Sequence, residues 1–224
     1  EDYHLHENFA EFLEAKHDER ATAERRKVCD LIPFFYFPYY RLGLDFEEQG
    51  RLDEAVQAFK QAAALRPAQS EVRLQLGIVY ARQSRWEPAL AEFERVRRAS
   101  PDDPRVNLYS AETLWKLGHR LDSITRLREA IHLHPDYWEA RYRLGDELAQ
   151  QEDVAMAAAE FEQVVRLNPN YVKAHANLGV ALYKLGRPNE AVQQFDEVLR
   201  LDPQNRQALE FKQQALNFKP AQNK

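Results

Sequence analysis

The chain has 224 residues, of which 44% are hydrophobic, 11% are aromatic and 30% are charged. This composition predicts a folded, soluble protein and excludes intrinsic disorder as its main state. The longest uncharged stretch near the aromatic cluster, Leu31–Tyr40, is half as long as the roughly 20 apolar residues of a membrane span, and two prolines interrupt it. The formal net charge of −5 disfavours a nucleic-acid partner, because phosphates would repel the chain.

Six prolines recur every 34 residues along the chain, at Pro33, Pro67, Pro101, Pro135, Pro169 and Pro203. Other positions follow the same step: leucine precedes glycine at Gly43, Gly77, Gly145 and Gly179, a small residue follows twelve positions later, and a large apolar residue four positions after that. The chain is therefore built from one repeated block.

Within each block the apolar residues are spaced by three and four, which predicts two helices per block. Gly50, Gly118 and Gly186 fall where a left-handed residue would end the first helix, and the recurring proline ends the second. Ser84 and Glu152 occupy the same turn position in two blocks, so we expect strain there. We also expect each glycine to face the small residue twelve positions later across a close helix crossing, as Gly145 would face Ala157.

These columns resemble the tetratricopeptide repeat family, and the resemblance covers residues 36–205 as five full repeats. It implies an all-α fold in which helix-turn-helix repeats stack into a right-handed superhelical solenoid. The repeat at 104–137 departs most from the pattern, through Ser110, Ala111, Ser123 and Leu127, and we expect its packing to be the least typical.

The two ends of the chain depart from the repeat. Residues 1–35 are interpreted as a degenerate N-terminal repeat. Residues 206–218 predict a terminal capping helix with Leu209, Ala215 and Leu216 on one face and Lys212 where a repeat would bury leucine. Residues 219–224 predict a disordered tail. No targeting segment is recognisable at Glu1, so such a segment was removed or never present, and the chain can be a piece of a longer protein.

No motif of catalysis, nucleotide binding or metal binding occurs in the sequence. The pairs His4/His6 and His132/His134 are two residues apart, so on a helix their side chains would point about 200° from each other. We expect His132 and His134 near a helix C-terminus instead. A single Cys29 excludes an internal disulfide and is read as a free buried thiol. The chain is therefore predicted to be a non-enzyme with no cofactor and no metal.

The family resemblance places the binding surface on a concave groove formed by the first helix of each repeat. Carried over onto this sequence, the groove-facing residues are Phe37, Tyr40, Arg41, Leu44 and Glu48; Glu71, Leu74, Gln75, Ile78 and Arg82; Arg105, Leu108, Tyr109, Glu112, Trp115 and Lys116; Tyr142, Arg143, Asp146 and Gln150; and Lys173, Asn177, Val180, Tyr183 and Lys184. Aromatic and arginine side chains are enriched at protein interfaces, although about one third of these rings is expected to pack on a neighbouring repeat instead.

Two specialised versions of the family can be tested on these positions. The chaperone-adaptor version needs Lys, Asn, Asn, Lys and Arg, where the first window of this chain has Tyr40, Leu44, Gln75, Arg105 and Tyr109. A glycosyltransferase-like version needs a column of asparagines, where this chain has Arg41, Gln75, Tyr109, Arg143 and Asn177. The first is absent, and only the last position of the second matches.

The run from Phe34 to Tyr40 contains six aromatic residues around Pro38. It is read as a linker into the first full repeat, with Pro38 in the first helical turn and Tyr39 in the core. The alternative is an aromatic lip at one mouth of the groove, and both can hold together.

The sequence therefore predicts a protein-interaction module whose groove binds an extended peptide or a helix of a partner protein. Two alternatives remain open: a docking or regulatory appendage of a larger enzyme or membrane protein, and a scaffold that associates with itself as a homo-oligomer. The compartment is left open, with the cytoplasm favoured over an exported one.

Overall fold

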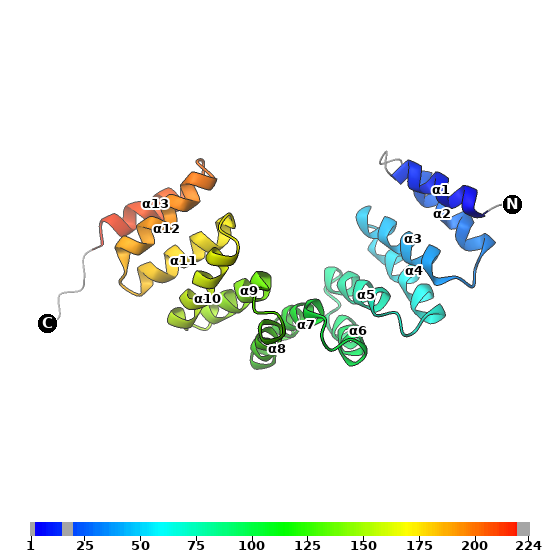
Figure 1. The fold of residues 1–224 in the computed structure, drawn as a ribbon, viewed down its shortest axis with the longest axis horizontal. Coiled ribbons are helices and arrows are strands. Elements are labelled where there is room, and N and C mark those ends of the chain that lie inside the picture. The colour runs from blue at the N-terminus through cyan, green and yellow to red at the C-terminus, as the bar shows by residue number, and fades with distance from the viewer. Residues whose placement is uncertain (1–2, 15–19, 219–224) are drawn as a thin grey trace. The chain divides into compact units, whose positions relative to one another are not determined.

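The computed structural model describes residues 3–14 and 20–218, and within them the chain forms thirteen α-helices and no strand (Figure 1). The helices are α1 (Tyr3–Glu14), α2 (Arg20–Leu31), α3 (Tyr36–Glu48), α4 (Leu52–Leu65), α5 (Ser70–Arg82), α6 (Trp86–Ala99), α7 (Pro104–Lys116), α8 (Arg120–Leu133), α9 (Trp138–Gln150), α10 (Val154–Leu167), α11 (Val172–Lys184), α12 (Pro188–Leu201) and α13 (Arg206–Leu216). The predicted all-α repeat solenoid is confirmed. The predicted tail at 219–224 lies outside the described residues.

The chain divides into two compact units, residues 1–123 and residues 124–224. In unit 1 the pairs α1/α2, α3/α4 and α5/α6 pack internally and each packs on the next, and in unit 2 the pairs α9/α10 and α11/α12 do the same, followed by α13. We call the face of a unit carried by the first helix of each pair its inner face. The outer face is carried by the second helices.

The predicted turns between paired helices are present, and all five have a residue with positive φ. The values are 73° at Gly50, 84° at Gly118 and 72° at Gly186, and 58° at Ser84 and 64° at Glu152. A side chain in this left-handed region crowds its own backbone, so Ser84 and Glu152 carry the strain that the sequence predicted. Each second helix ends two residues before the recurring proline, as in α4 before Pro67.

We expected each helix glycine to face a small residue on the second helix, but this expectation is wrong, because the glycine faces a phenylalanine ring. A Cβ built on Gly145 would lie 2.8 Å from the ring of Phe161, and the same ring contact recurs at Gly43, Gly77 and Gly179. Phe161 lies one helical turn beyond Ala157 and is 1% exposed. The missing Cβ therefore makes room for a buried ring on the second helix.

The third full repeat replaces both members of this contact. Ala111 stands in the glycine column and Leu127 in the phenylalanine column, and both are fully buried. A larger residue on one helix is thus accompanied by a smaller one on the other. The hydroxyl of Ser123 donates to the carbonyl of Ala111 at 2.8 Å, while Ser110 Oγ is buried without a hydrogen-bond partner.

In three repeats a polar link joins the first helix, the second helix of the same pair and the preceding loop. Arg141 Nη1 donates to Glu160 Oε2 at 3.0 Å and its Nε donates to the Pro135 carbonyl at 3.0 Å. The same three-way link is formed by Arg73 with Glu92 and Pro67, and by His175 with Gln194 and Pro169. The third repeat has Asn107 at this position, with its Oδ1 buried and without a hydrogen-bond partner.

The N-terminal helices bury an ion pair. Arg25 on α2 is fully buried and pairs with Asp45 on α3, which is 7% exposed. The Glu7 carboxylate lies near this pair, and burial raises its pKa while Arg25 opposes that shift. Cys29, also on α2, is 4% exposed and is a free thiol, as predicted.

The C-terminal helix α13 packs through a different face from the predicted one. Ala208 and Ala215 are buried against the preceding pair, whereas Leu209 and Leu216 are each 58% exposed. The packed face is therefore rotated by one residue. Lys212 Nζ pairs with Asp196 on α12 at 2.6 Å, so its charge is held at the edge of the contact.

Candidate functional site

The inner face of unit 1 is formed by α3, α5 and α7, and its tyrosines lie over the buried phenylalanine column. The ring centroids of Tyr40 and Phe59 are 5.9 Å apart, and those of Tyr109 and Phe93 are 5.8 Å apart. Burial is the main cause that raises the pKa of both tyrosines. These rings are half-buried and partly serve to pack one repeat on the next.

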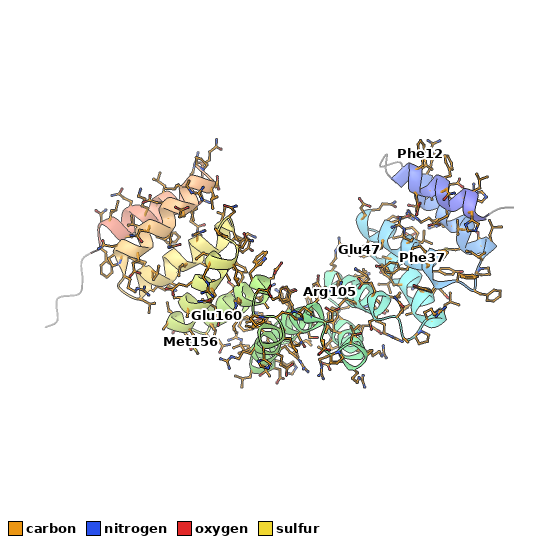
Figure 2. All side chains as sticks on the ribbon, in the orientation of Figure 1. Phe12, Phe37, Glu47, Arg105, Met156 and Glu160 are labelled. Atoms are coloured by element: carbon orange, nitrogen blue, oxygen red, sulfur yellow. The ribbon has the colours of Figure 1, made fainter. Side chains whose placement is uncertain are left out.

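Ion pairs between successive repeats occupy two arginines of this face. Arg82 Nη1 on α5 lies 2.9 Å from Glu47 Oε1 on α3, and Arg105 Nη2 on α7 lies 2.9 Å from Glu71 Oε2 on α5. Figure 2 shows Glu47 and Arg105 on unit 1. An acidic ligand would therefore have to compete with carboxylates already present.

The other predicted residues of this face are spread along it. Leu44 and Ile78 are half-buried against the core, and Gln75 donates to Glu71 at 3.4 Å. Lys116 is exposed, and the ring of Trp115 lies 5.2 Å from the Arg120 guanidinium. The remaining residues are the half-buried Arg41, Leu108 and Glu112, the exposed Glu48, and Leu74, which is 1% exposed. Leu74 is thus a core residue and not part of the surface.

The inner face of unit 2 contains an aromatic cluster around Tyr142. The Tyr142 ring lies 5.8 Å from Phe161 and 5.0 Å from Tyr171, which in turn lies 4.8 Å from Trp138. Asn177 Nδ2 donates to the Tyr142 hydroxyl at 3.3 Å. Burial raises the pKa of Tyr142 to about 12, and Tyr171 and Asp146 act in the same direction.

Two members of this cluster were missed because their helical columns do not face the groove. Tyr171 lies in the loop before α11 and Trp138 begins α9. The only sequence signal was another tyrosine, Tyr137, one period of 34 residues before Tyr171.

Next to the cluster, α9, α10 and α11 enclose a pocket of about 130 Å³, which we call the inner pocket. Its polar lining is Asp146, Asn177 and Lys184, and its apolar lining is Ala149, Val154, Phe161, Val180 and Ala181. Asp146 accepts from Gln150 at 3.0 Å, and Arg143 Nη1 lies 4.0 Å from the same carboxylate. Within the described residues, no hydrogen bond or ion pair engages Lys184. Four predicted groove residues thus meet in one pocket.

Two predicted positions of unit 2 lie apart from this pocket. The Tyr183 ring packs edge-on to Phe218, with centroids 5.4 Å apart. Lys173 is exposed near the start of α11.

Both interpretations of the aromatic run are consistent with the structure. Pro38 is buried in the first turn of α3, and Tyr39 packs on the core. Phe34, Phe35 and Phe37 are exposed, Phe34 by 85%.

The histidine pairs show no sign of metal binding in the part of the chain that the structure describes. His132 lies in the last turn of α8, as predicted, and His6 Nδ1 lies 2.8 Å from Glu24. No group of three His, Cys, Asp or Glu side chains there could hold a metal ion.

None of the described helices is long and apolar enough to cross a bilayer.

Comparisons with known proteins agree with this architecture. Two family models described as tetratricopeptide repeat match residues 47–112 and residues 110–159 and 142–206. No curated protein matches the sequence.

Solved structures share the fold at low sequence identity. One is YrrB, described as a tetratricopeptide repeat protein with an unusual peptide-binding site, at 22% identity and a TM-score of 0.65, covering 84% of this chain and 97% of YrrB. Another is pilF from Pseudomonas aeruginosa, at 22% identity and a TM-score of 0.72, covering 81% and 83%. A third is MamA, at 21% identity and a TM-score of 0.64, covering 79% and 98%. Repeat columns, helix pairs and family models together show that this chain belongs to the tetratricopeptide repeat family.

Proposed function

We propose that the chain is a non-catalytic module that binds an extended peptide of a partner protein, and that the inner pocket receives one of its side chains. The observation that carries this proposal is the meeting of Asp146, Asn177, Val180 and Lys184 around one apolar-floored space. Repeat proteins of this family generally serve as scaffolds for protein–protein interaction, and YrrB is described as binding a peptide.

The pocket indicates the chemistry of the peptide. Its lining is mainly apolar, so it suits an aliphatic side chain, whose transfer from water supplies binding free energy. The unpartnered Lys184 ammonium can donate a hydrogen bond to a peptide carbonyl or carboxylate. Asn177 already donates to Tyr142, which leaves its amide oxygen to accept a peptide N–H.

To test this, random twelve-residue peptides displayed on phage are selected for binding to the wild-type chain. The dissociation constants of the selected peptides are then measured by calorimetry. Val180→Phe should fill the pocket and Lys184→Glu should reverse its charge, each weakening binding by about tenfold or more, about 1.4 kcal/mol. The matched control, Arg166→Glu at an exposed position of α10, should bind as wild type does. Binding that survives both inner-pocket changes would show that the inner face is not the binding surface.

The tyrosines of this face need a milder change than truncation. Tyr142 packs on Phe161 and Tyr171, so Tyr142→Ala would damage the fold as well as the surface. Tyr142→Phe removes only the hydroxyl that accepts from Asn177. Circular dichroism of each variant shows whether the helices remain.

A further inference from the structure

The outer face of unit 2 carries a second pocket, distinct from the inner pocket. It has a volume of about 360 Å³ and lies between α8, α9 and α10; we call it the outer pocket. Its floor is formed by the side chains of Leu144 and Leu148, which are 3% and 4% exposed. Met156 and Ala159 on α10 form one wall, and Met156 is 46% exposed (Figure 2).

The equivalent place in unit 1 is filled by an aromatic ring under a cation. Leu148 and Arg128 stand two repeat periods after Tyr80 and Lys60. The Tyr80 ring is buried, with Lys60 Nζ 6.0 Å and the Arg85 guanidinium carbon 4.7 Å from its centroid. In unit 2 the leucine is smaller than the ring, and Arg128 lines a pocket instead of covering an aromatic side chain.

The rim of the outer pocket is basic. Arg128 and His132 are four residues apart on α8, so they share one face of that helix. Among the described residues, neither has a hydrogen-bond or ion-pair partner. The acidic residue of the rim, Glu160, is held by Arg141 at 3.0 Å, so its charge is already matched.

We propose that the outer pocket binds an aromatic side chain of a partner peptide, with an adjacent carboxylate of that peptide paired with Arg128. The ring would occupy the space that Tyr80 fills in unit 1, and the guanidinium would lie over its face, where a cation is attracted to the ring electrons. A neighbouring Asp or Glu of the peptide meets the unpartnered Arg128 guanidinium on α8, which supplies charge complementarity. This site is on the opposite face from the inner pocket and does not depend on it.

The chain contains its own reporter for this site, because Met156 is the only methionine of its sequence. Labelling with ¹³C-methyl methionine, with any initiator methionine removed, gives one methyl resonance at the pocket wall. The probes are the capped tripeptides acetyl-Glu-Phe-Glu-amide, acetyl-Gln-Phe-Gln-amide and acetyl-Glu-Ala-Glu-amide. An aromatic ring that turns its face to the methyl group shifts the methyl resonance upfield, whereas the alanine peptide cannot.

We expect a saturable upfield shift with Glu-Phe-Glu, weaker binding with Gln-Phe-Gln and no upfield shift with Glu-Ala-Glu. Arg128→Gln should weaken Glu-Phe-Glu binding about fivefold, whereas the control Arg166→Gln, at an exposed position of α10, should not. Leu148→Tyr restores the residue found at position 80 and should abolish the shift. Ala159→Phe fills the pocket from an exposed position and should do the same without altering the core.

The result that would overturn the proposal is a methyl resonance that stays unchanged up to the solubility limit of Glu-Phe-Glu. An upfield shift that persists in Ala159→Phe, with the helical spectrum intact, would equally place the ring elsewhere and refute it. Equal binding of Glu-Phe-Glu to wild type and Arg128→Gln would refute the role of the cation.

Discussion

Arg141 Nη1 lies 3.0 Å from Glu160 Oε2, nineteen residues further along the chain, while the same guanidinium donates to the Pro135 carbonyl. One side chain thus joins both helices of a pair to the loop that precedes them. His175 and Gln194 form the same link in another repeat, so its geometry recurs there without an arginine–glutamate ion pair.

Glu160→Ala should lower the free energy of unfolding by about 1–2 kcal/mol, because it leaves the half-buried Arg141 short of an acceptor. The control is Glu190→Ala, whose carboxylate pairs with Arg187 on the exposed surface of the same unit, so its loss should cost clearly less. Urea denaturation followed by circular dichroism measures both. Equal midpoints for the two variants would show that the polar link contributes no more than a surface pair.

Glu152→Gly should raise the stability of the chain by about 1 kcal/mol, because glycine adopts φ of 64° without crowding. The matched change in the opposite direction is Gly186→Ala, at φ of 72° in the same unit, which should destabilise by a similar amount. Thermal unfolding measures both. A loss of stability in Glu152→Gly would mean that the side chain stabilises this turn by more than the strain costs.

Gly145→Ala should destabilise by about 1–3 kcal/mol, since its Cβ would come within 2.8 Å of the Phe161 ring. Phe161→Leu alone should also cost about 1–3 kcal/mol through the space it leaves. The double variant reproduces Ala111 and Leu127 of the third repeat, so its cost should be at least about 1 kcal/mol below the sum. Strict additivity would refute the compensation between these columns.

Asp45→Ala should destabilise by about 3 kcal/mol or more, because it leaves the fully buried Arg25 charge without its carboxylate partner. Glu54→Ala is the comparison: this carboxylate pairs with Arg26 and Arg51 but is 42% exposed, so its loss should cost much less. Chemical denaturation distinguishes the two. A small effect of Asp45→Ala would indicate that water reaches Arg25.

The repeated features could be predicted from the sequence because each position is sampled several times. Five turns, six proline ends and the helix pairs followed from the period alone. The partner of Gly145 could not be identified, because Ala157 and Phe161 lie one turn apart on the same helix and only packing decides which is nearer. The Arg25–Asp45 pair has no counterpart in the other repeats, so no column marked it.

The candidate site was predictable in its positions but not in its exposure. The tyrosines at 40, 109 and 142 lie on the inner faces, yet each rests on a buried phenylalanine. A resemblance to a family assigns a residue to a face, whereas the exposed area of that residue depends on the side chains of the adjacent helix. The pairing of Arg82 with Glu47 is likewise a property of two neighbouring repeats.

The buried Cys29 makes the N-terminal helices open to kinetic measurement. A thiol reacts with alkylating reagents as the thiolate, and burial raises the pKa of Cys29 to about 12, with Asp30 and Glu7 acting in the same direction. In the native state, iodoacetamide at neutral pH should therefore modify this side chain only when α2 separates from its neighbours. Because no other cysteine exists in the sequence, the rate of alkylation, measured by mass spectrometry, reports that opening alone. Asp45→Ala should accelerate it, and Glu54→Ala should leave it unchanged.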